Sequence, residues 1–315
     1  MPPTSPPTPT LPGAKQPAGA SPNQARRLLR HLLHKRSAKI GGGIFLLLVF
    51  LAFFGPLVTP YDPFEIHVAQ RLQPPSLQHI FGTDEQGRDL FSRIIFGARY
   101  ALEIMLVTTT IGAAGGLLFG LPSAYFGGTA DMLVMRLMDI MLGFPYILLI
   151  LAIVAILGPS LDNAMIAIGV AGIPSFARLA RSAILVVKEQ DFVTAERALG
   201  ASHNRIMFRS ILPNILSPII VYISLSMPTA VLAAAALSFV GLGAQPPLPE
   251  WGAMLVNARD FIVTAPWVVL APGLTIFVIT LGINLFGNAL RDVLDPRDTT
   301  GLQGGKASGA IGKPQ

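Results

Sequence analysis

Between Lys188 and Asn214 the chain reads KEQDFVTAERALGASHNRIMFRSILPN, a charged and polar segment that separates two long apolar blocks. Six Lys and Arg side chains fall between Arg178 and Arg209. Loops that stay in the cytoplasm carry an excess of these residues, so this segment is expected on the cytoplasmic side of a membrane. A cytoplasmic loop that only joins two spans would be shorter than this segment or less regular in its predicted structure.

The same segment predicts a helix, a tight turn and a second helix. Asp191 is expected to cap the first helix, which runs to Leu199. Gly200 can adopt the left-handed conformation that ends a helix. Ser202 can cap the second helix, which is expected to end at Leu212–Pro213 because the residue before proline avoids helical geometry. The sequence therefore predicts a rigid helix-turn-helix protrusion, or knob, at the membrane surface, to which a soluble partner could bind.

Composition places the chain among polytopic membrane proteins. Of its 315 residues, 52% are hydrophobic and only 13% are charged. The net charge of +6 comes mainly from segments that flank the apolar blocks, so membrane topology explains it better than nucleic-acid binding. The absence of cysteine excludes a disulfide, thiol catalysis and a thiolate metal site.

Six apolar blocks are long enough to cross a bilayer, which predicts an all-α membrane protein with both termini in the cytoplasm. The first is expected to be a retained anchor because no clear cleavage site follows it. The expected spans cover about 40–58, 100–126, 132–157, 164–176, 215–240 and 267–290.

The remaining segments have distinct compositions. Residues 1–24 are rich in proline and small polar residues, which predicts a disordered tail. Residues 25–39 alternate leucine with Lys and Arg, as in a helix that lies on an anionic membrane surface. Residues 59–99 are expected to form an external loop, and 291–315 a cytoplasmic tail. The remaining spans, together with the cytoplasmic segment 188–214, are expected to form the core of the protein over 100–290.

Several residues inside the spans predict how the helices pack. Gly112, Gly116 and Gly120 recur every four residues and would let another helix approach closely. Arg136 and Asp139 lie three apart and can pair on one helical face.

Prolines and tryptophans give further expectations. A kink is expected at Gly143 and Pro145, and a break at Pro174. Trp251 and Trp267 are expected to act as anchors at the membrane interface.

The external segment contains HIFGTDEQGRDLFSRIIFGARYAL, from His79 to Leu102. Its glycines permit tight turns, and Asp84, Arg88, Asp89 and Arg93 are expected to pair with one another near the surface. These side chains either pin the loop without touching substrate or form a gate or receptor-docking surface.

Two segments resemble one family. The His79–Leu102 segment resembles the signature before the second span in dipeptide/oligopeptide/nickel ABC importer permeases. The matching positions are Gly82, Thr83, Asp84, Gly87, Arg88, Asp89, Ser92, Arg93, Gly97, Ala98 and Arg99.

The Lys188–Asn214 segment is similar to the coupling loop of these permeases, whose usual form is Glu-Ala-Ala, three residues and Gly. Aligned on Gly200, the usual Glu falls at Thr194, and the acidic side chain is displaced to Glu196. The resemblance implies an ATPase-docking surface that comprises Asp191, Phe192, Ala195, Glu196, Arg197, Ala198, Leu199, Gly200, Ala201, Ser202 and Arg205.

The resemblance further implies the type I importer permease fold and a complex with a sister permease, two ATPase subunits and an external substrate-binding protein. ATP and Mg would then reside on the ATPase subunits, because the chain contains no G-x-x-x-x-G-K-[ST] loop. Without H-E-x-x-H or G-x-S-x-G motifs, we expect neither an enzyme nor a metal site. Substrate-binding residues are not assigned.

The cargo expected from the resemblance is a di- or oligopeptide. Nickel chelates and other small solutes in the same family are the alternative. A secondary transporter should show internal repeats and midplane carboxylates, which the sequence lacks apart from Asp139. A membrane scaffold would not require the helix-Gly-helix knob.

Overall fold

The structure of the chain is a computed structural model that describes residues 35–294. The predicted tail over 1–24 lies outside the described residues, as do 25–34 of the predicted surface helix and 295–315 of the predicted cytoplasmic tail. Within 35–294 the fold is helical, and the single extended pairing is a bridge between Thr83 and Asp89.

Helices follow one another with short connections except between α2 and α3. The longer helices are α2 (Arg36–Val58), α3 (Leu90–Phe126), α4 (Gly128–Leu142), α5 (Tyr146–Leu157), α6 (Leu161–Lys188), α9 (Leu212–Phe239) and α11 (Trp267–Leu294). The shorter ones are η1 (Val68–Gln70), α7 (Asp191–Ala198), α8 (His203–Arg205), the π-helix η2 (Ile206–Ile211), α10 (Trp251–Ala258) and η3 (Arg259–Phe261).

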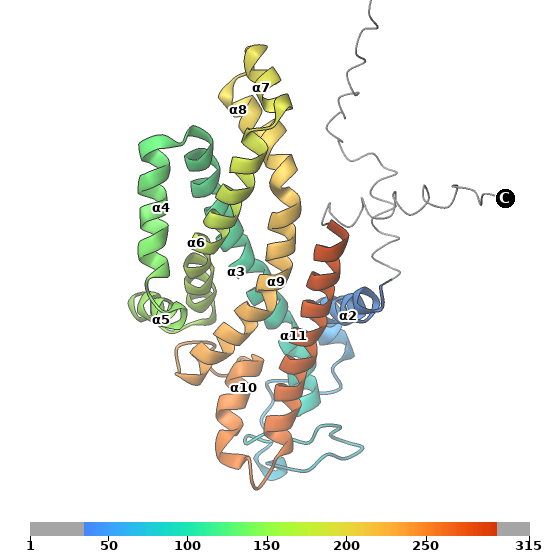
Figure 1. The fold of residues 1–315 in the computed structure, drawn as a ribbon. Helices are drawn as coiled ribbons and strands as arrows, with labels where there is room; N and C mark the ends of the chain where they lie inside the picture. The colour runs from blue at the N-terminus through green and yellow to red at the C-terminus, as the bar shows by residue number, and fades with distance from the viewer. Residues whose placement is uncertain (1–34, 295–315) are drawn as a thin grey trace, which may run out of the picture.

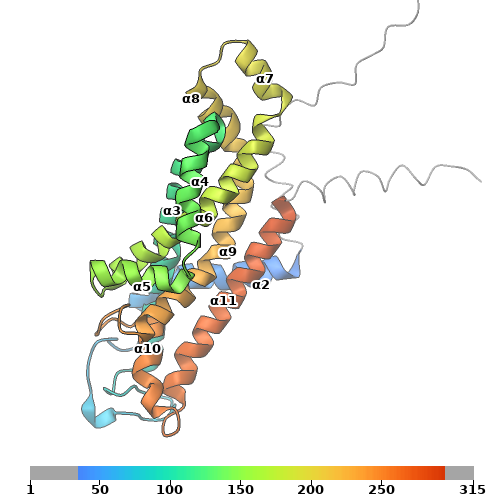
Figure 2. The same cartoon turned by 60° about the vertical axis from the view of Figure 1, so that its left-hand side comes forward.

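Within the described residues, five helices are long and apolar enough to cross a membrane, and the bent pair α4–α5 brings the number to six if it counts as one span. This agrees with the six predicted spans. In Figures 1 and 2, α3, α6, α9 and α11 form the upright bundle. The α7–α8 segment lies at one end, and α10 lies with the segment before α3 at the other. Both α2 and α5 run across the bundle direction (Figure 2).

The predicted glycine face on α3 packs against α6. A Cβ atom at Gly116 would lie 2.8 Å from the Ala177 amide nitrogen, and one at Gly120 would lie 2.9 Å from the Ala177 carbonyl oxygen. These distances are too short for a side chain, so the two backbones meet directly. The predicted close helix approach is confirmed.

Two apolar clusters stabilise the bundle. The larger one covers the middle and the α10 end, with Leu90, Ile104 and Ile150 among its buried members. The second lies under α7 and η2 and includes Ile184 and Ile211. Each end of the bundle is therefore stabilised by its own apolar cluster.

Two boundaries differ from the sequence prediction. Helix α3 begins at Leu90, inside the predicted external loop over 59–99, because Asp89 caps it. The predicted kink at Gly143 and Pro145 is a full break, with α4 and α5 bent by 93°.

Prolines break fewer helices than predicted. Helix α6 continues through the buried Pro174 to Lys188. Pro213 lies at the start of α9, where η2 leads into it without interruption. A proline removes one backbone hydrogen bond, and the wider π-turn and the packing of α9 accommodate that loss.

The predicted interface anchors also differ. Trp251 is 2% exposed, and its Nε1 donates a hydrogen bond to the Ile94 carbonyl at 3.1 Å. Trp267 lies against Gly82 and is only partly exposed. Both side chains join helices to the external segment, so the prediction that Trp251 anchors the chain in the interface is wrong.

Candidate functional site

The candidate docking knob, which we define as Asp191–Ile211, is built around one turn. Gly200 has φ of +78°, as predicted. Its amide donates to the Arg197 carbonyl at 3.0 Å, and the Ala201 amide donates to the Glu196 carbonyl at 3.0 Å. This pair of bonds is the Schellman arrangement that ends a helix at glycine.

The helix starts of the knob agree only in part with prediction. The Ser202 hydroxyl accepts from the Arg205 amide at 3.4 Å and caps α8, as expected. Asp191 is the first helical residue rather than the cap, and Gln190 occupies the cap position without a side-chain hydrogen bond. A carboxylate in the first turn still interacts favourably with the helix dipole.

The knob is fixed to the end of α3 by Tyr125, which is 4% exposed. The Tyr125 hydroxyl lies 2.9 Å from His203 Nδ1, and the Arg197 guanidinium lies 5.6 Å from the centre of the tyrosine ring. Val193 and Ile206 are fully buried beneath the two arms. The knob is thus held by both polar and apolar contacts.

Glu196 links the two arms of the knob. Its carboxylate accepts the Ser210 hydroxyl, with oxygen–oxygen distances of 2.8 and 2.7 Å to Oε1 and Oε2. Ser210 is buried in η2, while Glu196 is only partly exposed. The carboxylate displaced from the usual loop position therefore has a partner inside the chain.

Most of the predicted docking residues are accessible. Leu199 is 86% exposed at the tip of the knob. An exposed leucine beside an open glycine turn offers an apolar contact to a partner. The exposed members of the predicted set are Asp191, Ala195, Arg197, Ala198, Leu199, Gly200, Ser202 and Arg205, and the partly exposed ones are Phe192, Glu196 and Ala201.

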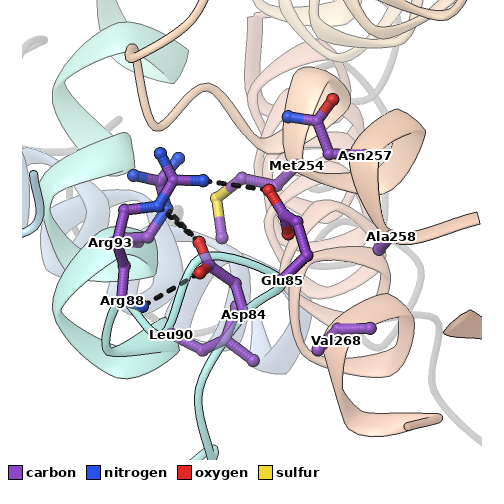
Figure 3. Close-up of a pocket in the computed structure, with 9 residues that line it drawn as sticks. All are labelled: Asp84, Glu85, Arg88, Leu90, Arg93, Met254, Asn257, Ala258 and Val268. Atoms are coloured by element: carbon purple, nitrogen blue, oxygen red, sulfur yellow. Dashed lines mark hydrogen bonds and ion pairs between the residues drawn. The ribbon is translucent and has the colours of Figure 1, made fainter. Parts of the chain in front are cut away.

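The external signature forms a buried ionic cluster at the opposite end of the bundle (Figure 3). Arg88 Nε donates to Asp84 Oδ2 at 2.7 Å, and Arg88 Nη2 donates to Glu85 Oε1 at 3.0 Å. Arg93 Nη1 donates to the Pro63 carbonyl at 2.8 Å, and its Nε lies 3.4 Å from Asp84. Asp84, Arg88 and Arg93 are at most 3% exposed, so the expected pairing is present but buried rather than near the surface.

Asp89 does not pair with an arginine as predicted. Its Oδ2 accepts from the Ser92 amide at 2.8 Å and so caps α3, while its Oδ1 lies 2.9 Å from His79 Nδ1. The Asp89 carboxylate interacts with the N-terminus of α3 and with His79, because Arg88 and Arg93 both point toward Asp84. Asp89 therefore fixes where α3 begins.

Two glycines and a threonine shape this loop. Gly82 and Gly87 have φ of +76° and +78°. A Cβ atom at Gly87 would overlap the His67 carbonyl. The Thr83 hydroxyl accepts from the Gln73 amide at 2.8 Å and donates to the Gln70 carbonyl. These interactions support the loop-pinning alternative.

Two further carboxyl groups lie at this external end, the partly exposed Glu85 and the buried Glu250. Burial, followed by the charge of Asp84, raises the pKa of Glu85. Burial also raises the pKa of Glu250, which the sequence analysis did not identify. Glu250 caps α10 by accepting from the Gly252 and Ala253 amides, and it also accepts from the Ser238 hydroxyl at 2.9 Å. The sequence signal that was available is a glutamate that follows two prolines closely and directly precedes the run Trp251–Val256, a pattern typical of a helix cap.

A third region is a cavity of about 450 Å³ among α3, α4, α5, α6 and α9. Its lining is mostly apolar, with a few polar side chains that include Tyr146, Ser175 and Tyr222. Beside it, Arg178 Nη2 donates to Asp139 Oδ1 at 2.6 Å. The predicted Arg136–Asp139 pair is absent from the described residues because α6 presents a better placed arginine.

With this geometry in view, comparison with known proteins identifies the family. A family model described as the binding-protein-dependent transport system inner membrane component matches residues 116–299. The chain belongs to this family. A second model, the N-terminal TM domain of oligopeptide transport permease C, matches residues 23–75. Together with the helical architecture, this confirms the predicted type I ABC importer permease fold.

Relatives match most of the chain. The dipeptide transport system permease protein DppC of Alkalihalophilus pseudofirmus is 48% identical over 272 residues, which are 86% of this chain and 90% of the relative. The di/tripeptide transport system permease protein DppC of Pseudomonas aeruginosa is 48% identical over 291 residues, covering 90% and 96%. The glutathione transport system permease protein GsiD of Escherichia coli is 45% identical over 253 residues, covering 80% and 84%.

Proposed function

We propose that this permease is the C-type subunit of an ATP-driven importer and that it forms, with a sister permease, the path for di- or oligopeptides. An external binding protein would deliver the peptide. Two ATPase subunits would hold ATP and Mg²⁺, and their closure would move the knob. The chain would lie in the cytoplasmic (inner) membrane with both termini in the cytoplasm.

The knob is the observation that carries this proposal. It projects beyond the bundle, has a glycine turn with nothing within 4 Å of an added Cβ atom, and presents an exposed leucine. It is also fixed to α3 through Tyr125 and joined to α9 through η2. A force applied to the knob would therefore reach two bundle helices. A coupling element needs this combination of exposure and attachment.

The peptide cargo is supported by the relatives. The names of the three relatives described above specify dipeptides, di- or tripeptides and glutathione, which is itself a tripeptide. Nickel chelates and unrelated small solutes are therefore not favoured. The geometry of residues 35–294 contains nothing that favours an ion-gradient transporter or a scaffold.

The proposal is tested by purifying the tagged permease from its native membrane in mild detergent and identifying the bound chains by mass. We expect a soluble ATPase and a second permease. Gly200→Arg should lose the ATPase while it retains the sister permease, because the substitution adds bulk and charge at the exposed turn.

Gly158→Arg is the matched control. Gly158 also has positive φ, +94°, and open space around it, but it lies between α5 and α6, away from the knob. This variant should still bind the ATPase. Equal ATPase recovery with Gly200→Arg and wild type would overturn the docking assignment. Wild-type permease that binds no ATPase would overturn the importer assignment.

A further inference from the structure

The Asp139–Arg178 ion pair is unusual because it is exposed although it lies between two membrane helices. The side chains are 49% and 54% exposed, respectively. Each charge has the other as its partner at 2.6 Å, but roughly half of each side chain faces outward from the bundle. The surroundings of this outward face determine what the pair can do.

The pair lies about three turns into α4, beyond Asp131, which pairs with Arg181, and beyond the exposed Arg136. From the start of α4 at Gly128 to Asp139, the helix rises about 16 Å at 1.5 Å per residue. Met132 and Leu133, each 64% exposed, lie between the pair and that end of the helix. Exposed apolar side chains of this kind require lipid or an apolar partner. The ion pair is therefore deeper than the start of the apolar layer.

Lipid cannot be the neighbour of the exposed charges. A charged side chain within the bilayer is costly, and such residues face the interior of a bundle or a water-filled cavity. The outward face of this pair must accordingly meet water or polar protein. In an importer whose path lies between two permeases, the polar face of this subunit is the one turned toward that path.

The cavity beside the pair leads to the same conclusion. Leu142 and Ser175 line the cavity of about 450 Å³ and lie one helical turn from Asp139 and Arg178, respectively. The hydroxyls of Thr109 and Ser226 in this lining donate to carbonyls of their own helices. The cavity thus presents a largely neutral wall, with the ion pair next to it.

We propose that the Asp139–Arg178 pair faces the aqueous transport path and screens passing solutes by charge, favouring a zwitterion. A zwitterionic solute can align its ammonium with Asp139 and its carboxylate with Arg178. A solute with net charge gains one attractive contact and meets an uncompensated repulsion. This inference rests on the proposed importer function and adds the charge class of the solute.

Water accessibility provides the first test. The chain contains no cysteine, so Asp139→Cys and Arg178→Cys each introduce a single thiol. A charged, membrane-impermeant methanethiosulfonate reagent should modify both thiols in the assembled complex. Phe277→Cys is the control, because Phe277 is 61% exposed on the apolar surface of α11. Modification no faster than that of the Phe277 control would overturn the proposal.

Charge selectivity provides the second test. The reconstituted importer, with saturating binding protein, would be assayed with Ala-Ala, Ala-Lys and Ala-Glu. Arg178→Gln should shift the Ala-Lys to Ala-Glu rate ratio toward Ala-Lys by about tenfold, equivalent to ~1.4 kcal/mol. Asp139→Asn should shift the ratio the opposite way, and the double variant should restore it.

The outcomes separate the two proposals. An equal fall in all three rates, with unchanged ratios in every variant, would show that the pair is structural and would overturn the charge screen. The double variant removes both members of the pair and leaves neither of them without its partner, so it tests the screen even if a single variant folds poorly. Arg136, which is exposed three residues before Asp139, is present in every variant and does not change the comparison. Failure of the wild type to transport any dipeptide would instead refute the proposed cargo, and the labelling experiment would still decide whether the pair faces water.

Discussion

The two ends of the bundle are held together by different interactions. At the external end, Asp84, Arg88 and Arg93 form an ionic cluster that is almost fully buried. At the knob end, the buried groups are mainly apolar, and the charged residues lie on the exposed rim. The ionic cluster fixes one loop geometry, whereas the knob leaves its polar groups available to a partner. The external end is therefore suited to holding one loop conformation, and the knob end is suited to binding a partner.

This difference has an energetic consequence. Removing one member of a buried ion pair leaves an uncompensated charge and costs about 3–5 kcal/mol. Substitutions at exposed positions usually change stability by less than about 0.5 kcal/mol. Variants at the external end should therefore change folding, and variants at the knob surface should change binding.

The largest effect is expected for Arg88→Ala. It removes the main partner of the buried Asp84 and of the partly exposed Glu85 and should cost about 3–5 kcal/mol. The measurement is the thermal unfolding midpoint in detergent. Arg259→Ala removes the exposed Arg259–Asp260 pair and should cost about 0–1 kcal/mol. Similar losses for both variants would contradict the distinction between buried and exposed charges on which the comparison of the two ends rests.

The next largest effect on stability is expected where the glycine face of α3 packs against α6, between the two ends. Gly116→Ala should destabilise the permease by about 1–3 kcal/mol, because the new Cβ atom would crowd the Ala177 backbone. Gly172→Ala on α6 meets nothing within 4 Å and should stabilise by about 0.5–1 kcal/mol. If the unfolding midpoints of both variants move in the same direction, the α3–α6 contact is less tightly packed than the distances at Gly116 indicate.

A smaller effect is expected inside the knob. Glu196→Ala and Ser210→Ala each break the link between α7 and η2 and should cost about 1–2 kcal/mol locally. The double variant should cost little more than either single one, since both remove the same interaction. Hydrogen exchange of the knob amides would measure this. Fully additive losses would show that the two side chains act independently.

The pH dependence at the external end should be smaller still. Burial raises the pKa of Glu250, so the folded chain binds more protons than the unfolded chain above the ordinary value of 4.5. The stability contribution of this group should therefore fall as pH rises from 4.5 through the raised pKa. Glu250→Gln should flatten the curve of unfolding midpoint against pH. An unchanged slope would assign the dependence to other groups.

The smallest effect on folding is expected at the knob tip. Leu199→Ser should leave the unfolding midpoint unchanged within about 0.5 kcal/mol, because the side chain is 86% exposed. The same variant should weaken ATPase binding and ATPase stimulation in the assembled complex. Normal stimulation would show that the tip is not part of the docking surface.

Local rules predicted much of this molecule. The four-residue spacing of glycines predicted the packing face on α3. The residue preferences of helix ends predicted the Gly200 turn and the Ser202 cap. Each of these depends on neighbours within a few residues. Burial of the signature was not predicted, because the Pro63 segment and α10 cover it after folding.

Partners distant in sequence were also missed. Asp139 was expected to pair with Arg136, three residues away, but the folded chain brings Arg178 from α6 to 2.6 Å. Pro174 was expected to end its helix, yet burial on the α6 face outweighs one lost hydrogen bond. In both cases tertiary packing overrides a correct local preference.

Helix α3 joins the two ends directly. Asp89 of the external cluster caps its first turn, and Tyr125 at its last turn holds the knob. With 37 residues, it is about 55 Å long at 1.5 Å per residue. A tilt of one degree about its external end would thus displace the knob end by about 1 Å. If the proposed docking is correct, partners at the two ends would act on the same helix, and a small rotation at the external end would produce a larger displacement at the knob.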